Sequence, residues 1–148
     1  MEKTLSDGLP LPQRYGAIAT IIIGISMAVL DGAIANVALP TIASDLHASP
    51  ASSIWIVNAY QIAIVVSLLS FSFLGDMFGY RRVYQCGLVV FTFTSLLCAL
   101  SDSLHTLTLA RIAQGFGGAA LMSVNTALIR LIYPQRHLGR GMGINSFI

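Results

Sequence analysis

The chain has 148 residues, of which 55% are hydrophobic and only 9% are charged, and its formal net charge is +2. Its mean hydropathy is +0.78. Because soluble globular domains carry about 25% charged residues, this composition excludes an ordinary water-soluble domain and indicates a membrane protein. The small net charge gives no reason to expect a nucleic-acid partner.

Apolar runs of membrane-crossing length follow one another along the chain. A transmembrane helix needs about 20 mostly apolar residues, and we expect four such spans after a polar N-terminal tail, residues 1–14. The predicted fold class is all-α, a polytopic transmembrane helical bundle that corresponds to residues 15–148. The expected spans cover about residues 15–39, 54–74, 83–100 and 106–133, and the start of a fifth follows from 141.

Two details of these spans follow from their residues. Proline removes a backbone donor and disfavours continuation of a helix, so we expect the first span to end at Pro40. The third span carries almost nothing polar, so we expect it to face lipid.

The basic residues predict the orientation of the bundle. Short loops rich in Lys and Arg stay on the cytoplasmic side of the membrane during insertion. The expected outer loops, 41–53 and 101–105, contain no Lys or Arg. The basic residues near the ends of the spans all fall on the opposite side, which predicts a cytoplasmic N-terminus. These residues are Lys3, Arg14, Arg81, Arg82, Arg130, Arg136 and Arg140.

Two charged residues lie deep inside the expected spans, where charges are costly. Asp31 lies about 12 Å from the outer end of the first span, and Arg111 about 10 Å from the outer turn at Leu104, at 1.5 Å per residue. Because the opposite charges have similar depths, we expect these spans to be neighbours with Asp31 close to Arg111. Such a carboxylate can exchange a proton against a cationic substrate. The alternative is a fixed ion pair that only joins two helices.

Other polar residues inside the spans either line a substrate cavity or form hydrogen bonds between helices. These residues are Asn36, Asn58, Gln61 and Asn125. The small residues Gly115, Gly118 and Ala119 share one face of the fourth span, where they would let another helix approach closely. No spacing typical of a metal site, a catalytic nucleophile or a nucleotide-binding unit appears, so we expect no metal, no cofactor and no enzymatic activity.

A short charged stretch joins the second and third spans. Its residues Asp76, Gly79, Arg81 and Arg82 place it at the cytoplasmic membrane surface. In one interpretation Asp76 pairs with an inner cation such as Arg130 in one conformation and releases it in another, which makes the stretch a latch for alternating access. In the other, it is a tight glycine turn whose arginines only set the topology.

Three motifs resemble those of the major facilitator superfamily. The charged stretch is similar to the family's loop G-x-L-x-D-x-x-G-x-[RK]-[RK], although Ser72 replaces the first glycine and Met77 and Tyr80 replace common basic residues. Residues 30–40, LDGAIANVALP, resemble the first-span motif of the drug:proton antiporter branch, particularly its fourteen-span members. Residues 107–119 are similar to the fourth-span pattern L-x-x-x-R-x-x-Q-G-x-G-x-A.

The resemblance implies proton-coupled export of small, lipophilic cationic or multidrug-type compounds by alternating access, although Arg111 leaves neutral and anionic compounds open. It associates Arg111 with proton coupling and Asp76 with gating. Protons, a small-molecule substrate and membrane lipid would be the partners, and the location would be the bacterial inner membrane.

The resemblance also implies that the chain is an N-terminal portion of a longer transporter, whose remaining spans would complete it. The alternative is a small four-span membrane protein that associates with itself through its fourth span. Such a protein would be either an exporter or a remnant or scaffold that transports nothing.

Overall fold

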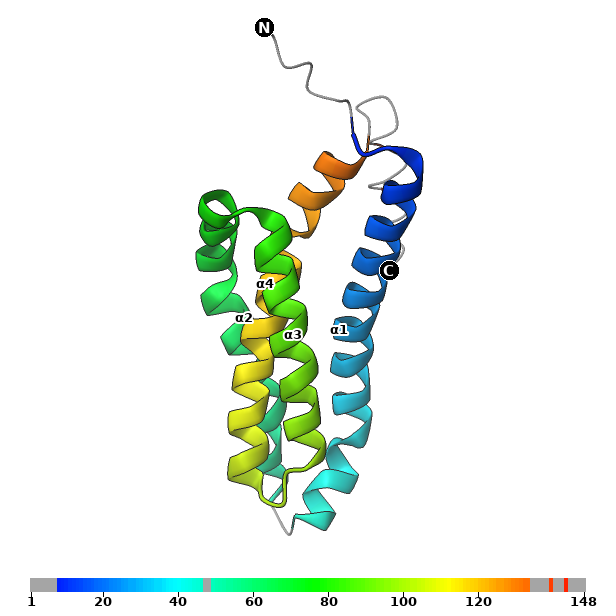
Figure 1. Ribbon diagram of the computed structural model, residues 1–148. Helices are drawn as coiled ribbons and strands as arrows, with labels where there is room; N and C mark the ends of the chain where they lie inside the picture. Colours follow the sequence, from blue (N-terminus) through cyan, green and yellow to red (C-terminus); the bar gives the residue numbers. More distant parts are fainter. Residues whose placement is uncertain (1–7, 47–48, 134–138, 140–142, 144–148) are drawn as a thin grey trace, which may run out of the picture.

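The computed structural model describes residues 8–46, 49–133, 139 and 143. In this part of the chain every regular element is an α-helix, and each of the four helices is long and apolar enough to cross a membrane. The predicted all-α fold class is therefore confirmed. The helices are α1 (Leu11–Asp45), α2 (Pro50–Phe78), α3 (Tyr80–Ala99) and α4 (Leu104–Ile132) (Figure 1). Half of the expected N-terminal tail, nearly all of the expected fifth span, and Lys3, Arg136 and Arg140 fall outside the described residues.

Serine side chains cap the first turns of α2 and α4. Ser49 Oγ accepts a hydrogen bond from Ser52 N at 3.1 Å, and Pro50 occupies the first helical position. Ser103 Oγ accepts from Thr106 N at 3.2 Å, and Thr106 Oγ1 accepts from Ser103 N at 3.3 Å. These bonds satisfy backbone donors that a helix start leaves unpaired, so both helices begin where the sequence supplies a cap.

Several helix ends differ from the expected ones. The prediction that the first span ends at Pro40 is wrong, because α1 continues through the proline to Asp45. Proline removes a single backbone donor, and a long transmembrane helix tolerates this loss. The charged stretch is also shorter than expected, since α2 runs to Phe78 and α3 begins at Tyr80. Gly79 alone separates them, with a φ of +94° that favours glycine.

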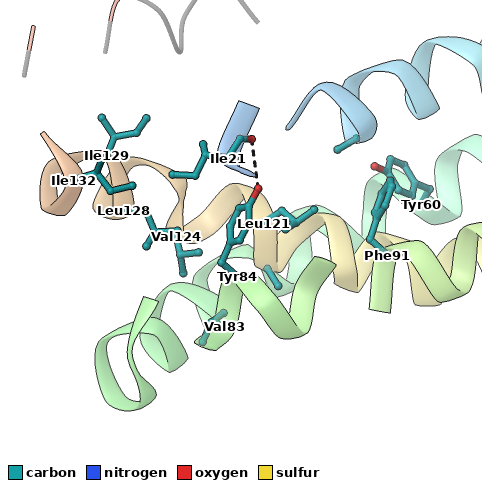
Figure 2. Packing of buried hydrophobic residues seen from close by; sticks show 12 residues of the cluster. Ile21, Tyr60, Val83, Tyr84, Phe91, Leu121, Val124, Leu128, Ile129 and Ile132 are labelled. Atoms are coloured by element: carbon teal, nitrogen blue, oxygen red, sulfur yellow. Dashed lines mark hydrogen bonds between the residues drawn. The ribbon is translucent and has the colours of Figure 1, made fainter. Parts of the chain in front are cut away.

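The centre of the bundle is α4. Helices α2 and α3 both lie along it (Figure 1). Figure 2 shows Leu121 and Val124 of α4 close to Tyr84 of α3 in the apolar core. Leu121 and Val124 have no exposed surface. The three helices α2, α3 and α4 therefore form one closely packed unit.

Small residues of α4 set how closely its neighbours approach. A Cβ on Gly115 would lie 2.7 Å from Tyr60 O of α2, and one on Gly117 would lie 2.7 Å from Phe91 N of α3. Ala119 is fully buried. Close packing of this kind holds helices together where the surrounding lipid is as apolar as the core. The faces of α4 that carry these small residues are thus occupied within the chain.

One side of α3 is buried against the other helices, so the expectation that the third span faces lipid is wrong for that side. For the exposed side it stays a prediction. Apolar side chains suit a helix interface as well as lipid, which is why composition alone did not separate the two. The buried residues are Val83, Tyr84, Gly87, Phe91 and Thr94.

Helix α1 packs less extensively than the other three helices. A polar contact links it to α3, because Tyr84 Oη donates to Thr20 O at 3.0 Å and to Ile21 O at 3.3 Å. Figure 2 shows the bond to Ile21. Gly24 leaves the room for this hydroxyl, since a Cβ at that position would overlap it. The contact between α1 and the rest of the bundle therefore depends partly on hydrogen bonds rather than on apolar packing alone.

Candidate functional site

A buried ion pair between α1 and α4 forms the polar centre of the bundle. Arg111 Nη1 lies 2.6 Å from Asp31 Oδ2, and only 9% of the Arg111 side chain and 21% of the Asp31 side chain are exposed. This is the only ion pair in the part of the chain that the structure describes. The two charges that the sequence placed at similar depth are thus in direct contact.

Gln114 joins both members of this pair. Its side chain is fully buried. Its Oε1 accepts a hydrogen bond from Arg111 Nη1 at 2.9 Å, and its Nε2 donates to Asp31 Oδ1 at 3.0 Å. Both carboxylate oxygens of Asp31 are therefore engaged, one by the guanidinium and the other by the amide. Such additional hydrogen bonds offset part of the cost of removing two charges from water.

Helix α3 completes this cluster of side chains. Gln114 Nε2 donates to Ser95 Oγ at 2.7 Å, and Cys98 Sγ donates to Gln114 Oε1 at 3.6 Å. We call Asp31, Ser95, Arg111 and Gln114 the Asp31 network. Sequence analysis identified neither Gln114 nor Ser95 as a site residue. Gln114 follows Arg111 by three positions on one helix face, a spacing that marks a neighbour, whereas a serine in a span expected to face lipid gave no signal.

A cavity of about 190 Å³ lies beside the Asp31 network, between α1, α2 and α4. Its wall is mostly apolar, and its polar residues are Asn36, Tyr60, Gln61 and Arg111. Arg111 is the only charged residue among the described residues of this wall, and Asp31 is not part of it. The Tyr60 ring centroid lies 5.8 Å from Arg111 Cζ, within the range of a cation–π attraction.

The structure separates the polar residues that the sequence grouped as possible cavity lining. Asn36 and Gln61 lie in the wall of the cavity. Asn58 is exposed on α2, Asn125 is buried in α4, and neither belongs to this wall. Gly118 lies near the cavity, because a Cβ there would be 3.2 Å from the hydroxyl oxygen of Tyr60.

The residues expected to form a gating loop lie at the turn between α2 and α3. Asp76 Oδ1 accepts a hydrogen bond from Tyr80 Oη at 2.5 Å across this turn. Within the described residues Asp76 forms no ion pair, either with Arg130 or with another cation. The two arginines diverge: Arg81 lines a cavity of about 710 Å³ between α1, α3 and α4, and Arg82 lines one of about 400 Å³ between α2, α3 and α4.

The carboxylate of Asp31 acts only as a hydrogen-bond acceptor in the described structure. One carboxylate oxygen accepts a hydrogen bond from Arg111 and the other accepts one from Gln114. A proton on either oxygen would therefore displace the donor that is bound there. The described residues contain no group of three or more His, Cys, Asp or Glu side chains able to hold a metal ion.

The chain is similar to known proteins over its whole length. Residues 21–148 match the family model described as Major Facilitator Superfamily. The chain is 86% identical over 148 residues to the uncharacterized transporter YebQ of Escherichia coli (strain K12). The alignment covers 100% of this chain and 32% of YebQ.

Two further relatives are more distant. The riboflavin transporter RibZ of Clostridioides difficile (strain 630) is 35% identical over 138 residues, 93% of the chain and 30% of that protein. The tetracenomycin C resistance and export protein of Streptomyces glaucescens is 36% identical over 139 residues, 94% of the chain and 25% of that protein. The chain thus spans about a third or less of the length of these relatives.

The Asp31–Arg111 pair predicts strong coupling between two substitutions. Asp31→Asn leaves the buried guanidinium without its counter-charge and should lower the free energy of unfolding by about 3–5 kcal/mol. Adding Arg111→Gln should cost much less than in the wild type, because no unpaired charge remains. Denaturant titration of the purified protein in detergent measures both effects.

Asp45→Asn, at the exposed end of α1, is the matched control for loss of one carboxylate. Its expected effect is within about 0.5 kcal/mol. Simple additivity of the Asp31 and Arg111 substitutions would contradict the coupling.

Proposed function

Because the chain belongs to the major facilitator superfamily, we propose that it takes part in the export of small lipophilic compounds in exchange for protons. The observation that supports this proposal best is the buried Asp31–Arg111 pair beside a cavity that Arg111 lines. An intramembrane carboxylate is costly and marks a functional position. Here its only charged partner in the described residues also faces the space where a substrate would lie.

The proposed exchange depends on how Asp31 holds Arg111. With the carboxylate ionised, Arg111 is fixed by Asp31 and Gln114 beside the cavity. A proton on Asp31 removes the charge attraction and releases the guanidinium from this position. The substrate needs Arg111 in this position, whereas a proton on Asp31 displaces it. Binding of the substrate and binding of the proton therefore exclude each other, as exchange transport requires.

The relatives support a transport function. One is named as a riboflavin transporter and another as a tetracenomycin C resistance and export protein. Since the chain covers about a third or less of their lengths, we propose that further spans of the same protein complete the walls of the cavity. Self-association through α4 is less favoured, because Gly115 and Gly117 already pack against α2 and α3.

We further propose that the protein lies in the bacterial inner membrane with the α2–α3 turn on the cytoplasmic side. The basic residues Arg14, Arg81, Arg82 and Arg130 support this orientation, because each lies at the end of a helix that approaches this surface.

The proton exchange can be tested in inverted membrane vesicles that carry the protein as expressed from its own gene. A transported compound should dissipate a preformed proton gradient, as reported by a fluorescent pH probe, across a panel of cationic and neutral lipophilic compounds. Asp31→Asn should abolish this response, because the carboxyl proton is the exchanged species.

Asp45→Asn, on the same helix, should leave the response unchanged at equal protein level in the membrane. A full response in the Asp31→Asn vesicles would exclude the proposed coupling role.

The turn between α2 and α3 is proposed to gate transport. Asp76 has Tyr80 as its partner in this conformation, and a cation elsewhere in the protein would take its place in the alternate one. Asp76→Asn should slow transport by about fivefold or more, the lower range of coupling between distant sites, and leave substrate affinity unchanged. Comparison of transport rate with equilibrium binding separates these effects. A normal rate, matching that of the exposed control Asp102→Asn, would show that the turn only sets topology.

A further inference from the structure

The cavity between α1, α2 and α4 presents a cation to its contents and no carboxylate. Arg111 is the only charged side chain of the described wall. Asp31, which the sequence suggested as the group that would attract a cationic substrate, lies outside the wall. Both of its oxygens are already engaged by Arg111 and Gln114. A positively charged substrate in this cavity would therefore lie against a guanidinium.

Arg111 also carries an unused hydrogen-bond donor. The residue is only 7% exposed, and its Nη1 donates to Asp31 and to Gln114. Its Nε is buried and has no acceptor in the described part of the chain. Buried donors are nearly always satisfied in folded proteins, because an unmade hydrogen bond is costly. A ligand oxygen that reached the guanidinium from the cavity would satisfy this donor.

The rest of the wall indicates what carries that oxygen. The ring of Tyr60 lies beside the guanidinium, and the other lining residues are mostly aliphatic, among them Ile25, Val29 and Ile64. Such a surface suits a flat, apolar ring system. The volume of about 190 Å³ is smaller than a complete site of about 300–1,000 Å³ for a drug-sized ligand. This part of the protein therefore takes one end of a substrate.

We propose that the cavity binds the carbonyl-bearing end of a neutral, ring-containing compound, with the carbonyl oxygen accepting a hydrogen bond from Arg111 Nε, and that it disfavours lipophilic cations. This inference rests on the proposed export function and narrows its substrate class. It also fits the proposed proton exchange, because the Nε donor stays in position only while the ionised Asp31 carboxylate holds the guanidinium.

Three probes separate the alternatives in an equilibrium binding measurement on the purified protein. Fluorenone is neutral and carries one carbonyl group, fluorene has the same ring system without it, and tetraphenylphosphonium is a lipophilic cation without an acceptor. We expect saturable binding of fluorenone at least about tenfold tighter than that of fluorene, the effect of one hydrogen bond to a charged donor. Tetraphenylphosphonium should not compete with fluorenone.

Arg111→Lys tests the donor itself. Lysine keeps the positive charge opposite Asp31 but lacks the fixed second N–H direction of a guanidinium, so the preference for fluorenone over fluorene should fall by about tenfold. Asn58→Ala is the matched control, because Asn58 lies on α2 outside the cavity wall. It should retain the wild-type preference. The comparison of fluorenone with fluorene in the wild type needs no variant, so the test survives if Arg111→Lys fails to fold.

The outcomes distinguish this inference from the proposed function. Equal binding of fluorenone and fluorene, or displacement of fluorenone by tetraphenylphosphonium, would overturn the substrate class. If tetraphenylphosphonium nevertheless dissipates a proton gradient, the export function stands without the inference. Arg111-dependent fluorenone binding with no proton-coupled movement of any probe would support the binding site and overturn the exchange.

Discussion

The contact on which the structure depends is a carboxylate facing a guanidinium across two helices in an apolar interior. Asp31 and Arg111 are each costly in hydrocarbon and become acceptable only together. Gln114 fixes their geometry from the same helix as Arg111, and Ser95 of α3 supports Gln114. The pair therefore positions α1 against the unit formed by the other three helices.

Two kinds of contact hold the helices of the bundle together. Small residues such as Gly115 and Gly117 bring α2 and α3 against α4 without polar groups, and packing of this kind does not respond to pH. Helix α1 packs less extensively, and its ties include the Asp31 network and the Tyr84 hydroxyl. Helix α1, which carries Asp31, is thus the helix whose attachment relies on polar contacts as well as on apolar packing.

Much of the fold was predictable, because hydropathy alone requires long apolar helices in a membrane. The closeness of Asp31 and Arg111 followed from their depths. Helix ends were less predictable, since α1 continues through Pro40 and a single glycine turns the chain at position 79. Ser95 was missed because nothing in the sequence marks which side of an apolar helix meets a polar partner.

The cavity lining was predicted only in part for a related reason. Asn36 and Gln61 lie in the wall, whereas Asn58 and Asn125 do not, and their positions depend on how each helix is rotated about its own axis.

The most direct test of the account counts the protons released when fluorenone binds the purified protein in weakly buffered solution, over a range of pH. Mutual exclusion at Asp31 predicts proton release in the wild type and none in Asp31→Asn. Binding without proton release, or equal release in the variant, would contradict it.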